Sequence, residues 1–158
     1  MEKIDLIDLR ILDQLQQDSS LSMAELAERV GLSTSPCWRR VRRMQEIGVV
    51  TSQSARLDRL KLGLGFVVYA FVKLSTTTRE TLNRFETTIS AWPEVMMCEC
   101  MTGAADYLIK VVTTDVQGYD QFLREKLLAT GLVADVQSRI VVRTVKDTTR
   151  LPLPDPQD

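Results

Sequence analysis

The segment Ser33–Met44 constrains the fold of this chain more than any other part of the sequence. Its apolar residues recur at helical spacing and form one narrow stripe, at Cys37, Val41 and Met44. Polar and basic side chains project elsewhere, with Ser35, Trp38, Arg39 and Arg42 opposite the stripe and Arg40 and Arg43 on its flank. Such a helix packs through its stripe and presents cations to a partner, although a basic face can also be merely a solvated surface.

Pro36 fixes where this helix begins, because proline is tolerated in a first helical turn, where its missing N–H costs nothing. Ser33 or Ser35 can cap the exposed N–H groups at this end. The start of the helix and its arginines therefore point outward together. We expect the contact surface to consist of Ser33, Thr34, Ser35, Pro36, Trp38, Arg39, Arg40, Arg42 and Arg43.

Two further helices are predicted before this one. Apolar residues at helical spacing, preceded by a cap at Asp5 or earlier, predict a helix over residues 5–17, with its stripe at Ile4, Ile7, Ile11 and Leu15. A capping box at Ser22 and Glu25 starts the next helix, and Gly31 supplies the left-handed residue that ends it. Three short helices with a Gly-containing turn before the last predict a helix-turn-helix, whose final helix enters the DNA major groove.

The segments 49–51 and 54–57 predict a small hairpin after the third helix, which would form a wing. Charge is distributed to match this arrangement. Residues 1–32 contain three basic and seven acidic residues, whereas residues 33–63 contain seven basic and two acidic ones. The net charge of −1 for the whole chain therefore conceals a basic stripe, and a local stripe orients a protein on double-stranded DNA.

Individual side chains of the basic helix have different expected roles. Arg39 and Arg42 are the best candidates for base edges, whereas Ser35, Arg40 and Arg43 are expected on phosphates. Trp38 has two interpretations, because it could cover the flank of the helix as a core residue or stack near sugar and phosphate.

Composition excludes several classes of protein. The 158 residues, 44% of them hydrophobic, suffice for one domain or two small ones, and neither a membrane span of about 20 apolar residues nor a secretion signal is present. We therefore expect a cytoplasmic protein. Three cysteines without a Cys-x-x-Cys pair, and without histidine, provide neither a disulfide framework nor a zinc site, so no metal or cofactor is expected. Cys98 and Cys100 share one strand face, as small buried hydrophobes or as a thiol sensor.

The second half of the chain alternates between strand and helix patterns. After a linker at residues 58–64, strands are predicted at residues 65–74, 95–101, 107–113 and 133–145, with helices at residues 78–92 and from Tyr119 to a stop near Gly131. The order βαββαβ is the ferredoxin-like split motif of an α+β fold. Its helices cover one face of the sheet, yet the strands are apolar on both faces, so we expect at least a dimer through the sheet.

These patterns divide the chain into three parts. Residues 1–60 form the helix-turn-helix domain with its wing and linker, and residues 61–150 form the ferredoxin-like domain. Residues 151–158 contain three prolines and are expected to form an extended, partly disordered tail.

Three motifs together resemble the Lrp/AsnC family of leucine-responsive and asparagine-responsive regulators, over essentially the whole chain. They are Pro36-Cys37-Trp38-Arg39-Arg40-Val41, Thr102-Gly103-x-x-Asp106-Tyr107-x-Ile109 and Val145-x-x-Thr148-Thr149-x-Leu151-Pro152-Leu153. The resemblance implies a transcription factor that forms dimers, and usually tetramers of dimers, on DNA near operons of amino-acid metabolism.

The resemblance also implies an effector site between neighbouring dimers, where a small amino acid lies against the loop Thr102–Tyr107. The residues that correspond are Thr102, Gly103, Ala104, Asp106 and Tyr107, with Val136, Gln137 and Ser138 on the facing wall. Gly103 lets the backbone approach a carboxylate, and Asp106 could receive an ammonium group. Ala104 departs from the family, in which this position is often acidic, and the methyl-rich loop favours an aliphatic or sulfur-containing effector.

Two other functional classes compete with this interpretation. An enzyme would need a poised acid, base or nucleophile, and the sequence contains no histidine, no phosphate-binding glycine loop and no paired carboxylates, so no catalytic residue is expected. An architectural protein that wraps DNA without a small effector stays open as the alternative, because Ala104 removes one anchor for an amino group.

Overall fold

A computed structural model describes residues 4–154 and divides the chain into two compact units. Among these residues, the first unit consists of 4–56 together with 146–154, and the second is Leu57–Val145. Residues 146–150, which we expected in the ferredoxin-like domain, and residues 151–154 of the predicted tail thus belong to the first unit. Residues 151–154 have no regular secondary structure, and residues 155–158 of the predicted tail lie outside the described residues.

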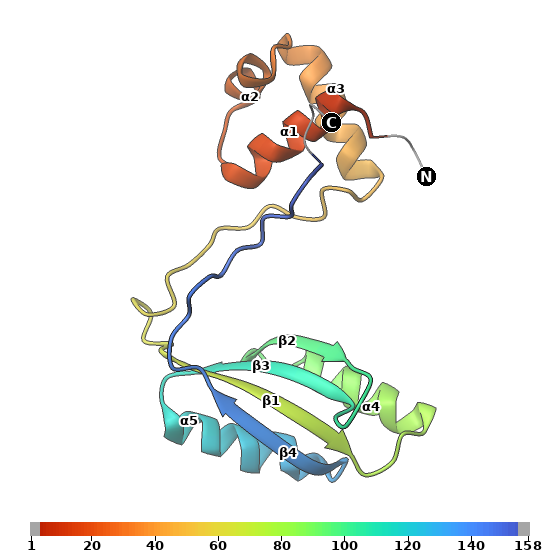
Figure 1. Cartoon of the computed structure of the whole chain (residues 1–158), viewed down its shortest axis with the longest axis vertical. Helices are drawn as coiled ribbons and strands as arrows, with labels where there is room; N and C mark the ends of the chain where they lie inside the picture. The colour runs from red at the N-terminus through yellow and green to blue at the C-terminus, as the bar shows by residue number, and fades with distance from the viewer. Residues whose placement is uncertain (1–3, 155–158) are drawn as a thin grey trace. The chain divides into compact units, whose positions relative to one another are not determined.

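The first unit contains three helices, α1 (Leu6–Gln17), α2 (Met23–Val30) and α3 (Thr34–Glu46) (Figure 1). Asp5 caps α1, and the capping box of Ser22 and Glu25 starts α2, as predicted. Gly31 ends α2 at a φ of 72°, in the left-handed region that glycine adopts without strain. The core between the helices is formed by Ile11, Leu12, Leu26, Ala27, Cys37, Val41 and Met44, which are all buried.

The predicted hairpin after α3 was wrong, because residues 49–57 contain no strand. The backbone N–H groups of Val49 and Val50 both donate to the Met44 carbonyl, so the end of α3 uses the donors that a hairpin would need. Residues 51–57 that follow are exposed throughout and bury no apolar face that could hold a hairpin in place.

The second unit is a four-stranded antiparallel sheet with helices, in the predicted order βαββαβ. Its strands are β1 (Phe66–Leu74), β2 (Val95–Cys100), β3 (Tyr107–Thr113) and β4 (Val133–Ile140), arranged as β2-β3-β1-β4. β4 ends five residues before the predicted Val145, because its partner β1 begins at Phe66 and the last bond runs from Val141 N–H to the Val67 carbonyl.

Helices cover one face of this sheet only (Figure 1). The helix α4 (Arg79–Ser90) is followed, after β3, by α5 (Val116–Gln121), a π-helical turn η1 (Phe122–Leu127) and a short η2 (Leu128–Thr130). Alternate β1 side chains pack beneath these helices in the core, at Val68, Ala70, Val72 and Leu74, whereas those of Tyr69, Phe71 and Lys73 face the other way and stay half-exposed. Within residues 4–154, no helix is long and apolar enough to cross a membrane.

Candidate nucleic-acid interface and ligand site

The outer surface of α3 is formed by its first residues and by one row of larger side chains. Ser33, Thr34 and Ser35 are exposed, and the Ser33 side chain makes no capping bond, contrary to the expected cap. Trp38 is 47% exposed, which excludes the core interpretation for this residue. The Arg42 guanidinium lies 5.2 Å from the centre of the Trp38 ring, and Arg39 is exposed beside them. This surface therefore combines a flat aromatic side chain with two guanidinium groups.

Arg40 and Arg43 have a different environment, because both contact the buried carboxylate of Asp8 in α1. The Asp8 side chain is fully buried, and its Oδ1 atom lies 2.8 Å from Nη1 of Arg40. Nη2 of Arg43 contacts the other carboxylate oxygen. Arg40 also donates to Asp5 at 2.6 Å. A buried carboxylate is stable only when it is paired, so these ion pairs join α3 to α1.

Hydrogen bonds in this cluster favour the charged forms of Asp5 and Arg40. The Asp8 backbone N–H, followed by the Arg40 guanidinium, holds the pKa of the Asp5 carboxyl below its usual value. Hydrogen bonds to Asp5 and Asp8 raise the pKa of Arg40. Sequence reasoning identified Asp5 only as a helix cap and missed Asp8, although acidic residues three apart in the first helix and a basic third helix were the available signal.

The predicted effector loop is a tight hairpin connection between β2 and β3. The Met101 N–H donates to the Asp106 carbonyl at 2.8 Å and closes the loop. Thr102, Gly103 and Ala104 are exposed, and Gly103 has a φ of 118°, which favours glycine. The loop therefore offers backbone groups and methyl groups to a ligand, without a charged side chain among these three residues.

Asp106 and Tyr107 anchor the loop internally. The Asp106 carboxylate receives bonds from Lys73 Nζ at 2.7 Å and from the Leu74 N–H at 2.8 Å, and these bonds lower its pKa, with Lys73 as the main cause. Tyr107 is buried, its hydroxyl donates to Glu86 at 2.7 Å, and burial raises its pKa. Both residues thus already have partners in the positions where the sequence suggested ligand contacts.

The predicted facing wall lies on β4, on the other side of β1. Val72 pairs with Tyr107 on one side and with Val136 on the other. Tyr107 and Val136 therefore lie about 10 Å apart across the sheet. Gln137 is exposed, and the Ser138 hydroxyl lies 2.5 Å from that of Tyr119. The loop and β4 therefore lie at the same height along the sheet. Within one chain, however, β1 keeps them apart.

Comparison with known proteins decides the family. The family model of the Lrp/AsnC ligand binding domain matches residues 67–151, and that of a winged helix-turn-helix DNA-binding domain matches residues 4–51. The chain belongs to the Lrp/AsnC family. It is a DNA-binding transcriptional regulator with a helix-turn-helix followed by a ligand-binding domain.

Relatives in the Lrp/AsnC family are similar along almost their whole length. The DNA-binding transcriptional activator DecR of Escherichia coli is 37% identical over 95% of this chain and 99% of its own. The Bkd operon transcriptional regulator of Pseudomonas aeruginosa is 40% identical over 97% of this chain and 100% of its own. A transcriptional regulator of Neisseria meningitidis, solved in complex with L-Met, superposes with a TM-score of 0.91 at 35% identity, covering 95% of this chain and 97% of the other.

Proposed function

We propose that this regulator binds operator DNA through the outer surface of α3, and that a small apolar amino acid held between copies of the chain modulates this binding. The exposure of Trp38, Arg39 and Arg42 on one side of α3 carries the first part of the proposal. Guanidinium groups on a helix whose opposite side is buried fit the major groove of double-stranded DNA. Such a protein acts where its DNA is, in the cytoplasm, and needs neither a catalytic residue nor a metal cofactor.

Fluorescence anisotropy with labelled promoter fragments tests the DNA contact. Wild-type protein should bind, and Arg42→Ala should bind more weakly and with less base preference. Arg124→Ala is a matched control, because Arg124 is also exposed and also pairs with a carboxylate four residues away, as Arg42 does with Glu46. Equal affinity of the two variants would contradict the proposal, as would absence of binding by the wild type in dilute buffer.

The effector is proposed to be an amino acid with an aliphatic or sulfur-containing side chain. Thr102, Gly103 and Ala104 present methyl and backbone groups, and the Neisseria relative was solved with L-Met. Because Asp106 is already bonded to Lys73 and Leu74, we place the effector's ammonium group on backbone carbonyls of the loop or on a second copy of the chain. Its carboxylate would lie against the backbone at Gly103.

The open face of the sheet is the proposed surface for assembly. Tyr69 and Phe71 lie half-exposed on this face, with Lys110 6.0 Å from the Tyr69 ring centre and Arg139 5.1 Å from that of Phe71. Two such faces can bury their aromatic rings against each other, while the long cationic side chains extend to the rim. We propose a dimer formed in this way, which associates further into tetramers of dimers. Phe71→Glu should lower the mass of the particle in light scattering, and unchanged mass would exclude this face.

The effector can change DNA binding only through its different affinity for two arrangements of the assembly. Isothermal titration against a panel of amino acids, followed by titration of operator DNA with and without the amino acid that binds, measures this linkage. A response to aliphatic or sulfur-containing members is expected. Silence across the panel, with DNA binding intact, would favour the alternative of an architectural protein that wraps DNA without an effector.

A further inference from the structure

The closing motif of the chain, around Leu151 and Leu153, lies on the first helix of the DNA-binding unit. The Leu151 N–H donates to Oε1 of Gln16 at 2.6 Å, and Nε2 of Gln16 donates to the Leu151 carbonyl at 3.3 Å. One side-chain amide thus pairs with both backbone groups of one residue, as a neighbouring β-strand would. This is a contact that recognises extended backbone.

Charged contacts flank this backbone contact. Nη2 of Arg150 lies 2.6 Å from Oδ1 of Asp13, one helical turn before Gln16. Further back along the segment, Nη2 of Arg56 contacts both the backbone carbonyl of Asp147, at 2.8 Å, and its carboxylate, at 3.0 Å. The segment therefore meets the helical unit at successive positions along its length.

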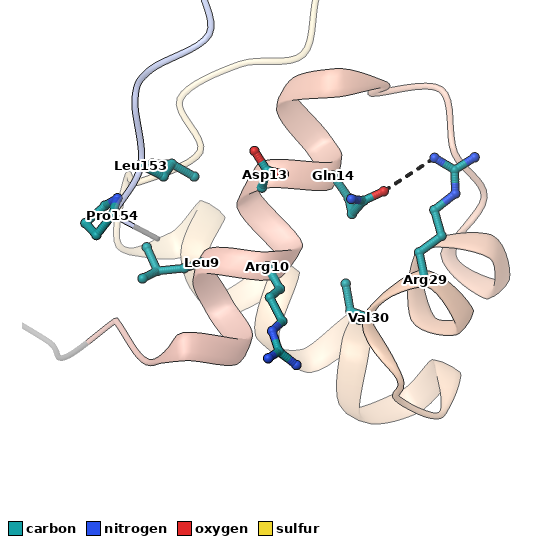
Figure 2. Close-up of a pocket in the computed structure, with 8 residues that line it drawn as sticks. All are labelled: Leu9, Arg10, Asp13, Gln14, Arg29, Val30, Leu153 and Pro154. Carbon is teal, nitrogen blue, oxygen red and sulfur yellow. Dashed lines mark hydrogen bonds between the residues drawn. The ribbon is translucent and has the colours of Figure 1, made fainter. Parts of the chain in front are cut away.

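An apolar contact completes the set. Leu153 packs against the core of the three helices and, with Pro154, borders a cavity of about 400 Å³ between α1 and α2. Figure 2 shows Leu153 and Pro154 beside Leu9, with Val30 on the far wall of this cavity. The Leu153 side chain thus extends the hydrophobic core of the helical unit.

We propose that α1 carries a binding surface for an extended peptide, formed by Leu9, Asp13 and Gln16, and that its occupant is the chain's own segment 147–154. The surface offers a carboxylate to Arg150, an amide to the Leu151 backbone and an apolar wall to Leu153. The DNA-binding unit is therefore built from both ends of the chain. The surface lies outside the proposed DNA and effector sites and does not depend on either.

Hydrogen exchange of a chain that ends at Lys146 tests this proposal. Loss of the segment should speed exchange of the α1 amides on the order of tenfold, because the contacts that oppose local opening of α1 are removed. Exchange of the β1 amides, in the other unit, should stay unchanged. A synthetic peptide of residues 146–154 should slow α1 exchange again in a saturable manner. A peptide with Arg150→Ala and Leu153→Ala should be inactive.

The same measurement on full-length variants covers the case in which the shortened chain does not fold. Leu153→Asp should speed α1 exchange at least fivefold, since it places a charge against the core. Arg143→Ala is the control, because Arg143 is exposed in the segment that precedes residues 147–154. Unchanged α1 exchange in Leu153→Asp, or a peptide without effect on a folded shortened chain, would overturn the proposal.

Discussion

The outer surface of α3 and the loop Thr102–Tyr107 differ in how complete they are within one chain. In each region, part of the polar set suggested by the sequence is bonded internally: Arg40 and Arg43 to Asp8, and Asp106 to Lys73. α3 still presents two guanidinium groups and an indole ring. The loop retains only small exposed side chains. We therefore propose that one chain suffices to present a DNA contact, whereas the ligand site uses groups from a second copy.

Asp8→Ala tests this comparison with the largest expected effect. The substitution removes a buried carboxylate that holds two guanidinium groups, and we expect a loss of about 3 kcal/mol in the free energy of unfolding, at the lower end for breaking a buried ion pair. The estimate is low because both arginines are about one-third exposed and recover water. Urea denaturation measures the change, with Asp120→Ala, which breaks an exposed pair, as the control. Similar stabilities of the two variants would mean that the cluster does not hold α3.

Arg42→Ala and Arg43→Ala separate the two kinds of arginine on α3. Arg42 is exposed and, among the described residues, pairs with Glu46 and contacts the Trp38 ring, both in its own helix. Its loss should therefore weaken operator binding by about 2 kcal/mol and change stability little. Arg43 contacts Asp8, so its loss should lower the free energy of unfolding instead. Anisotropy measures the DNA affinity of each variant, and urea denaturation measures its free energy of unfolding. If both variants lose only DNA affinity, the proposed division of roles is wrong.

Asp106→Ala applies the comparison to the loop. The carboxylate holds Lys73 and the Leu74 N–H, so its loss should lower the free energy of unfolding by about 1 kcal/mol. DNA affinity without effector should be nearly intact, while any amino-acid response should fall because the loop is no longer fixed. Thr102→Ala is the control for stability, because it alters the exposed loop surface without touching these bonds. A stable variant with a normal response would show that Asp106 does not position the loop.

The lowered pKa of Asp106 also gives this contribution a pH dependence. A carboxyl group with a lower pKa in the folded than in the unfolded state stabilises the fold above its unfolded pKa, near 4, and this stabilisation is lost as the pH falls through the folded pKa. The stability difference between wild type and Asp106→Ala should therefore shrink below about pH 4. A constant difference from pH 6 to pH 3 would exclude the charged interaction as its source.

Local patterns predicted the elements, whereas the partners of charged side chains required the structure. The cap at Asp5, the capping box of Ser22 and Glu25, and Gly31 located these helix ends correctly, because such signals act within a few residues. The ion pairs of Arg40 join residues more than thirty positions apart in the sequence. No local rule therefore distinguishes Arg40, which is paired with Asp5 and Asp8, from its exposed neighbour Arg39. The hairpin after α3 was predicted from composition alone. In the structure, the N–H groups of Val49 and Val50, which a hairpin would need, donate to the Met44 carbonyl at the end of α3.

The smallest expected effect concerns the salt dependence of DNA binding, and it distinguishes Arg39 from Arg40. A cation that contacts one phosphate contributes about 0.9 to the slope of log affinity against log salt. Arg39→Ala should reduce the slope by up to this amount. Arg40→Ala should reduce it less, because the Arg40 charge is largely compensated by Asp5 and Asp8 in the free protein. Anisotropy titrations from 50 to 200 mM salt resolve this difference. A larger change for Arg40→Ala would mean that its guanidinium leaves the carboxylates for a phosphate when the protein binds DNA.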